Sequence, residues 1–166
     1  MRALYYILSV CVITYALYLL ISQTHLKQLI VGGNSASEGF GAGTAVIITQ
    51  EGNHYGFNIE IADTDELRSQ GMMYRQSVEE RNGMLFLFPN SDIHAFWMRN
   101  TYIPLDILFI DENNVIVTIA NHAKPKSLQT IEPSKPINKA LEIKAGMATK
   151  LGIKEGDTIK YQRKDK

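Results

Sequence analysis

The spacing of apolar and polar residues divides the chain into three parts. Residues 3–21 form an apolar run without a charged side chain. From residue 44 onward, short runs of apolar and β-branched residues alternate with turn sequences, a pattern typical of strands in a sheet. We therefore predict an N-terminal apolar segment over residues 1–24, a flexible linker rich in glycine and serine over 25–43, and a single globular domain over 44–166.

The apolar run has the length of a membrane-spanning helix. At 1.5 Å per residue, a helix over residues 3–21 is about 28 Å long, which just crosses the apolar core of a bilayer. A cleaved signal peptide and a lipoprotein modified at Cys11 are the alternatives, but the run is longer than a signal segment and no convincing cleavage site follows it. We predict a single-pass cell-membrane anchor, with the domain on the extracytoplasmic (periplasmic) side.

The start of the domain predicts a hairpin and a short helix. Residues 44–50 and 55–62 have the composition of strands on either side of a Glu51-Gly52-Asn53 turn. Asp63 is placed to cap the N-terminus of a helix, and Gly71 offers a left-handed residue for the helix end.

Further short strands complete the predicted domain. Residues 105–110 and 115–120 form the clearest hairpin, because a turn rich in Asp and Asn separates them. The other predicted elements are strands at 84–88, 95–98, 140–144 and 158–162, a helical turn at 147–151, and a long loop at 121–138 that we expect to carry function. The fold class is therefore mainly β (α+β): a compact, small barrel-like or two-sheet domain with one or two short helices, preceded by one transmembrane helix.

Composition and charge exclude several kinds of chemistry. The single cysteine, Cys11, lies in the apolar run, so the domain has no disulfide, no thiol nucleophile and no cysteine-ligated zinc. Residues 31–112 carry twelve acidic and four basic residues, and residues 113–166 carry five acidic and eleven basic ones. Strands from both halves interleave in a small β domain, so this imbalance need not produce a charged patch, and we expect no nucleic-acid partner.

Five blocks of sequence resemble one known family. They are Arg68-Ser-Gln-Gly-Met-Met73, Gly83-Met-Leu-Phe-Leu-Phe88, Phe96-Trp-Met-Arg-Asn-Thr101, Ile103-Pro-Leu-Asp-Ile-Leu-Phe-Ile-Asp111, and Glu142 to Gly146 followed by Gly152-Ile-Lys-Glu-Gly-Asp157. In this order they resemble the domain of unknown function 192 family, also called uncharacterised protein family 0127. The resemblance implies a compact β-rich domain of a bacterial or archaeal protein, and many members of the family carry an export signal. The resemblance does not identify a reaction, and it supplies no catalytic residues.

Asp106 is the first candidate for a functional residue. Strict alternation along the predicted strand places it on the same face as Leu108 and Ile110, so its carboxylate is either near an exposed strand end or buried and hydrogen-bonded. One interpretation is a structural tether for the Arg99-Asn100-Thr101 segment. The other is a role in ligand binding or proton transfer.

Trp97 is the second candidate, because it lies between two apolar residues and either it or its neighbours must face outward. If its ring lies in a groove beside methionines, the result is an apolar pocket with a polar rim, as in most small-ligand sites. Ordinary core packing is the alternative. The candidate ligand-binding residues are Met72, Met73, Trp97, Met98, Arg99, Asp106 and Glu142, and we assign no catalytic residue.

Three functions are compatible with these candidates. The leading hypothesis is a non-catalytic envelope domain that binds a small molecule or a protein partner. A hydrolase-like enzyme would need Asp106 and Glu142 within reach of each other. A copper-binding envelope protein would draw its ligands from methionine and histidine, namely Met72, Met73, Met84, Met98, His94 and His122. The sequence has neither a metal-binding spacing nor a cofactor motif, so we predict no cofactor and no metal.

Overall fold

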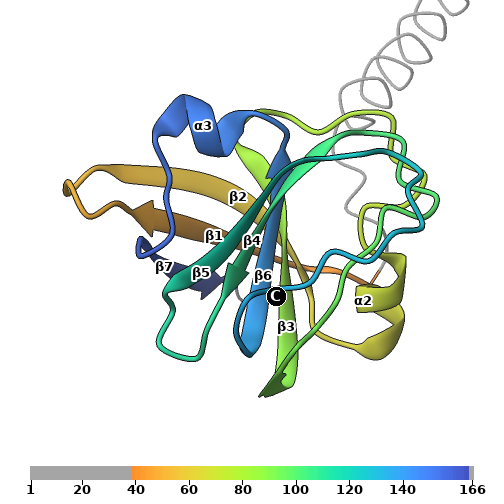
Figure 1. The fold of residues 1–166 in the computed structure, drawn as a ribbon, viewed down its shortest axis with the longest axis horizontal. Helices are drawn as coiled ribbons and strands as arrows, with labels where there is room; N and C mark the ends of the chain where they lie inside the picture. Colours follow the sequence, from red (N-terminus) through yellow and green to blue (C-terminus); the bar gives the residue numbers. More distant parts are fainter. Residues whose placement is uncertain (1–38, 165–166) are drawn as a thin grey trace, which may run out of the picture. The chain divides into compact units, whose positions relative to one another are not determined.

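The computed structural model describes residues 39–164, and the fold below is that of this part of the chain (Figure 1). The predicted anchor at 3–21 lies outside the described residues, as does most of the predicted linker. Among the helices that are described, none has the length and apolar character needed to cross a membrane.

One seven-stranded sheet forms the framework of the domain. Its strands lie in the order β5-β4-β6-β3-β2-β1-β7. All neighbours are antiparallel except β2 and β3, which are parallel; a parallel pair needs a crossover connection, and helix α2 lies in it. The bounds are β1 Gly41–Ile48, β2 His54–Ala62, α2 Asp65–Gln70, β3 Asn82–Asp92, β4 Leu105–Ile110, β5 Ile116–Ala123, β6 Ile137–Lys144, α3 Met147–Leu151 and β7 Thr158–Arg163.

The sheet is not a closed barrel, although its two edges meet at one corner. A single bridge joins Val115, beside β5, to Thr158 of β7. Two backbone hydrogen bonds support this corner, from the Ile116 amide to the Asp157 carbonyl (2.8 Å) and from the Ile159 amide to the Asn114 carbonyl (2.9 Å). The prediction of a mainly β domain with short helices is confirmed. In place of the predicted barrel-like or two-sheet arrangement, the domain has one sheet whose two edges touch at this corner.

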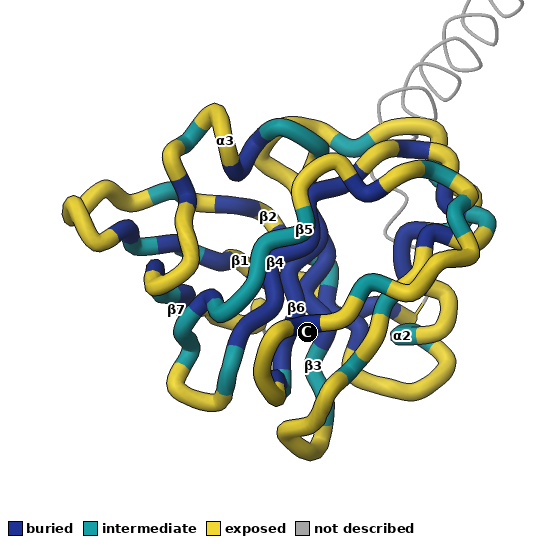
Figure 2. Tube along the Cα trace, in the orientation of Figure 1, coloured by how far each residue is buried: buried dark blue, intermediate teal, exposed yellow. Residues whose placement is uncertain are grey.

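Both faces of the sheet are covered, so the domain has two apolar clusters. One lies on what we call the α3 face, where Leu108 and Leu141 pack with Met147 of α3. The other lies on the α2 face, where Phe86 and Ile107 pack with Met72, just after α2. As a result, most residues of the central strands β4 and β6 are buried, as Figure 2 shows. A strand covered on both faces has a nearly continuous apolar sequence, as the predicted strand at 105–110 has.

Helix α2 begins one residue later than predicted. Its N-cap is Thr64, whose side chain accepts a hydrogen bond from the Leu67 amide, while Asp63 forms an ion pair with Arg163 of β7 at 2.6 Å. The predicted helix end is confirmed, because Gly71 has a positive φ of 47° there.

The predicted strand at 95–98 is wrong. This segment forms only an isolated bridge, between Phe96 and Ile131, because its neighbour is the irregular connection between β5 and β6 and not a strand. Its side chains still alternate, with Met98 fully buried and Trp97 43% exposed. Residues 95–101 therefore form an irregular segment on the α2 face, which we call the strap.

Strand β1 begins at Gly41, inside the predicted linker. Gly43 lies so close to β7 that a Cβ atom there would be 2.6 Å from the carbonyl oxygen of Gln162. This glycine therefore permits close strand packing, whereas the sequence suggested a flexible tether.

Candidate functional site

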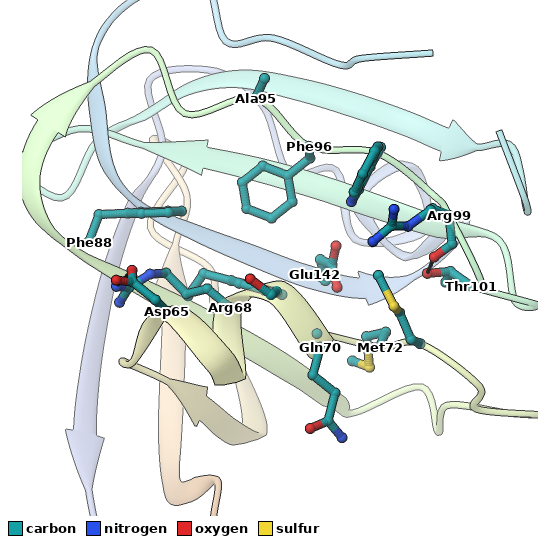
Figure 3. A pocket seen from close by; sticks show the side chains of 15 residues that line it. Asp65, Arg68, Gln70, Met72, Phe88, Ala95, Phe96, Arg99, Thr101 and Glu142 are labelled. Carbon is teal, nitrogen blue, oxygen red and sulfur yellow. Dashed lines mark hydrogen bonds and ion pairs between the residues drawn. The ribbon is translucent and has the colours of Figure 1, made fainter. Parts of the chain in front are cut away.

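A pocket of about 400 Å³ opens on the α2 face, between α2, the end of β3 and the strap formed by residues 95–101 (Figure 3). Small-ligand pockets have volumes of roughly 300–1,000 Å³, so this one suits a small molecule. Its lining combines aromatic and methionine side chains with a few polar ones: Asp65, Arg68, Ser69, Gln70, Gly71, Met72, Met73, Phe86, Phe88, Ala95, Phe96, Trp97, Arg99, Thr101 and Glu142.

Aromatic side chains from β3 and from the strap meet in the pocket wall. The ring of Phe96 lies edge-on to Phe86, with centroids 5.0 Å apart, and edge-on to Phe88, with centroids 6.2 Å apart. Phe86 and Phe88 come from the same face of one strand, since they are two residues apart. Such edge-to-face packing holds the rings in a defined arrangement, so the apolar wall is largely pre-formed.

Arg68 of α2 is held in place by the protein itself. Its guanidinium donates to the Asp65 carboxylate at 2.5 Å and to the Leu87 carbonyl at 2.6 Å, and it lies 5.5 Å from the centre of the Phe88 ring. The positive charge of Arg68 is therefore balanced by a neighbouring acid.

Arg99 has no such acidic partner among the described residues. Its guanidinium carbon lies 4.0 Å from the centre of the exposed Trp97 ring, a stacked arrangement that favours a cation over an aromatic face. The guanidinium makes no hydrogen bond or ion pair with any described residue, so its donors are free to bind a ligand.

Glu142 lies at the inner end of the pocket, on the central strand β6. Its neighbours across the sheet are Met84 of β3 and Ile107 of β4, both fully buried and apolar. The residue is 4% exposed, and its Oε2 atom has no hydrogen-bond partner among the described residues. A buried polar group without a partner is uncommon and costs stability, which makes Glu142 a candidate functional residue.

Burial also changes the protonation of Glu142. It raises the pKa of this carboxyl to about 8, against a smaller opposing effect from the positive charge of Arg75. Arg75 is itself bound through two hydrogen bonds, of 2.7 and 2.6 Å, to the carboxylate of Glu60. Glu142 is therefore neutral at pH 7 and carries an O–H group that can donate a hydrogen bond into the pocket.

Three of the five described non-glycine residues with a positive φ lie in loops beside the pocket. Tyr74, Asn100 and Lys126 have φ angles of 64°, 55° and 61°, in a region that side chains other than glycine seldom adopt. Hydrogen bonds connect these loops, from the Tyr74 amide to the Asn100 carbonyl (2.8 Å) and from the Lys126 amide to the Thr101 carbonyl (3.1 Å). Strain of this kind concentrates at functional sites, and here it adjoins two lining residues, Arg99 and Thr101.

The structure brings together five of the seven sequence-derived candidates. Met72, Met73, Trp97, Arg99 and Glu142 all line the pocket. Met98 does not, because alternation along the strap turns its side chain into the core, away from Trp97.

Asp106 lies on the opposite, α3 face of the sheet. Its carboxylate is fully buried and accepts hydrogen bonds from the His122 amide and from the Ala148 amide in the first turn of α3, both at 2.9 Å. A tether through backbone amides was one of the two interpretations, but the segments it holds are β5 and α3, not the predicted Arg99-Asn100-Thr101 segment.

The proposed carboxylate pair does not form. Asp106 is opposite Ile143 in the β4–β6 register, and Glu142 is opposite Ile107, so the two side chains point to opposite faces of the sheet. Hydrolysis by this pair, as the enzyme hypothesis required, is therefore inconsistent with the fold.

The two histidines of the copper hypothesis lie on different sides of the sheet, whereas Met72, Met84 and Met98 share the apolar cluster of the α2 face. Within residues 39–164 no group of three or more His, Cys, Asp or Glu side chains could hold a metal ion. His94 is stacked on Phe88 with centroids 3.8 Å apart, and His122 adjoins Asp106 on the α3 side of the sheet.

Sequence reasoning missed Arg68 and the three phenylalanines of the wall. Phe86 and Phe88 could have been found from the two-residue period of their strand. Phe96 and Arg68 could not, because their position depends on how the strap and α2 pack over the sheet.

Comparisons with known proteins agree on the family and the fold. A model of the DUF192 family, described as Uncharacterized ACR, matches residues 46–161. A crystal structure of a "putative transcription regulator" from Sinorhizobium meliloti 1021 is similar at a TM-score of 0.72 and 35% identity, over 74% of this chain and 95% of that one. A protein of unknown function from Novosphingobium aromaticivorans DSM 12444 is similar at a TM-score of 0.72 and 34% identity, over 75% of this chain and 89% of that one. No curated protein matches the chain.

Proposed function

The chain belongs to the DUF192 family, and from this premise we propose that its domain is a non-catalytic module that binds a small molecule in the pocket on the α2 face. One observation carries the proposal: a buried carboxyl, that of Glu142, lies at the inner end of an aromatic pocket without a hydrogen-bond partner among the described residues. A ligand that forms a hydrogen bond with this carboxyl removes the energetic cost of a buried polar group without a partner.

Binding is favoured over catalysis by the groups that line the pocket. The lining contains no histidine or cysteine side chain. Its two carboxyl groups do not form an acid-base pair, since Asp65 is engaged by Arg68 in an ion pair. The arrangement therefore provides recognition through an apolar wall and a few polar groups, which is the usual build of a binding site.

We further propose that residues 3–21 hold the domain at the membrane, on its extracytoplasmic side. The length and apolar character of this run support the proposal, together with the resemblance to a family in which many members carry an export signal. A protein partner in the envelope is the second candidate for the ligand, because Trp97 and Arg99 at the pocket mouth are exposed.

A thermal-shift screen of the full chain in detergent tests the binding function. The probes are a library of small aromatic acids, amides and amines, and a bound probe raises the melting temperature in proportion to the logarithm of its concentration over Kd. Ala95→Trp places a large ring in the pocket, so we expect this variant to lose the shifts. Leu128→Trp is the matched control at an exposed position outside the pocket lining and should keep them.

Two results would contradict the proposal. If the same probes stabilise Ala95→Trp as well as the unchanged protein, they bind elsewhere. If no probe stabilises either protein, the pocket takes no small molecule, and a protein partner becomes the better hypothesis.

A further inference from the structure

The carboxyl at the inner end of the pocket can donate a hydrogen bond to a ligand. Glu142 is protonated at neutral pH because burial raises its pKa to about 8, and a protonated carboxyl donates one hydrogen bond. Within the described residues its Oε2 atom finds no partner, and its cross-strand neighbours Met84 and Ile107 are apolar. Because Glu142 lines the pocket, a group that enters it can approach this carboxyl.

The charge of the lining favours an anion. Asp65 balances Arg68 through an ion pair of 2.5 Å, and Glu60 balances Arg75 through one of 2.6 Å. With Glu142 neutral, the positive charge of Arg99 has no acidic counterpart among the described residues. A cationic ligand would add to this charge, whereas an anionic one would compensate it.

The walls favour a flat, apolar body. Phe86, Phe88, Phe96 and Trp97 all line the same space. Aromatic side chains pack best against other flat rings, in offset or edge-on arrangements. A volume of about 400 Å³ is ample for a body of this kind.

From these three features we propose that the ligand is a small aromatic carboxylate, whose oxygen accepts a hydrogen bond from Glu142 and whose charge is compensated by Arg99. Figure 3 shows Glu142 and Arg99 facing the same space between α2 and the strap. The inference rests on the proposed binding function and adds the chemical class of the ligand.

The proposal carries a pH dependence with a defined direction. Glu142 loses its proton above about pH 8 and then repels a carboxylate. Arg75, outside the lining, acts on Glu142 through its positive charge. The charged groups of the lining besides Glu142 are Asp65, Arg68 and Arg99. Arginine keeps its charge throughout this range, so the affinity should fall as the pH rises past 8.

Three probes with the same apolar body distinguish the possible ligand classes: 3-phenylpropionate, 3-phenylpropionamide and 3-phenylpropylamine. Their binding to the full chain in detergent is measured by calorimetry at pH 6.5. We expect the carboxylate to bind about tenfold more tightly than the amide or the amine, as befits one added charge-assisted hydrogen bond. Arg99→Met should reduce this preference.

Glu142→Gln separates the hydrogen bond from the charge. Its amide still donates a hydrogen bond but does not titrate, so the carboxylate should bind within a few-fold of the original affinity at pH 6.5 and should keep that affinity at pH 9.5. The unchanged protein should lose about tenfold per pH unit above 8. This pH profile of the unchanged protein is informative even if the variant does not fold.

Each alternative outcome overturns a different statement. A preference for the amine or the amide refutes the carboxylate but leaves the pocket as a binding site. An affinity for the carboxylate that is the same at pH 6.5 and 9.5 refutes the role of Glu142. If none of the three probes binds at millimolar concentration, the inference fails, and a failed library screen would show that the proposed function fails with it.

Discussion

Two buried acidic side chains in this domain have opposite surroundings. Asp106 accepts hydrogen bonds from two backbone amides, whereas the Oε2 atom of Glu142 has no partner among the described residues. A buried carboxylate is stable when hydrogen bonds replace its lost hydration, and a carboxyl without them retains its proton. The first side chain therefore stabilises the fold, and the second is available to a ligand.

The protonation of Glu142 predicts how stability depends on pH. In the unfolded chain this carboxyl ionises near its ordinary pKa of 4.5, whereas in the folded domain it keeps its proton up to about pH 8. Between these values the folded state binds one more proton than the unfolded state, so the free energy of unfolding should fall as pH rises, by roughly 1 kcal/mol per pH unit for this group. The contribution is complete below pH 4.5 and lost above pH 8.

Glu142→Gln isolates this contribution, because glutamine does not titrate. Urea unfolding at a series of pH values should show the free energy of unfolding of the unchanged protein falling relative to that of the variant between pH 5 and 8. Parallel curves for the two proteins would mean that Glu142 ionises in the folded state as readily as in the unfolded one.

Asp106→Asn should lower the free energy of unfolding by about 2–3 kcal/mol, because the variant's NH₂ group faces a backbone amide that needs an acceptor. Binding of 3-phenylpropionate at a temperature where the variant is folded should not change. Glu132→Gln, at an exposed position, is the control for loss of one acid. Unchanged stability together with lost binding would instead assign Asp106 to the ligand site.

At the scale of elements, the stability of the domain depends on how closely its strands approach one another. Strand β1 lies between β2 and β7, and Gly43 is the position where β1 has no room for a side chain beside β7. Gly56 of β2 is also a strand glycine, yet nothing lies within 4 Å of a Cβ atom placed there. Two glycines in neighbouring strands therefore serve different purposes.

This difference predicts opposite effects for the same substitution. Gly43→Ala should destabilise the domain by roughly 1–3 kcal/mol, because the methyl group would press on the Gln162 carbonyl and separate β1 from β7. Gly56→Ala should be neutral or stabilise by up to about 1 kcal/mol, since alanine reduces the freedom of the unfolded chain. Thermal unfolding of both variants provides the comparison, and equal effects would refute the close contact.

At the scale of the whole domain, the two faces of the sheet differ: one is closed by packing, and the other contains the pocket. The α3 face is closed by α3 and held by Asp106, and it has a continuous apolar cluster. The α2 face is covered by α2 and by irregular segments, and the pocket opens between them. Irregular segments are less uniformly packed than strands, which is why the cavity occurs on this face.

Deleting residues 1–38 should release the domain from the membrane without unfolding it. Residues 39–166 form a compact unit of their own, so the shortened chain should unfold cooperatively at a melting temperature within a few degrees of that of the full chain. The full chain should sediment with membranes, and a C-terminal reporter that is active only outside the cytoplasm should be active. A full chain found free in the soluble fraction, or a reporter active only in the cytoplasm, would refute the proposed anchor or its orientation.

The sequence by itself determined the family, the mainly β fold and most of the elements. The hairpin at 105–110 and 115–120, the helical turn at 147–151 and the end of α2 at Gly71 are confirmed, because periodicity and turn chemistry act between residues close in the chain. Local signals were insufficient to predict the structure at 95–98. This apolar run does not form a strand, because the segment beside it is irregular.

Only the tertiary structure decided which acidic residue serves the fold and which faces the pocket. Asp106 binds an amide 42 residues further along the chain, and the neighbours that raise the pKa of Glu142 come from other strands of the sheet. Hydrogen-bond partners and burial depend on contacts between distant segments, and a linear pattern of residues does not contain them.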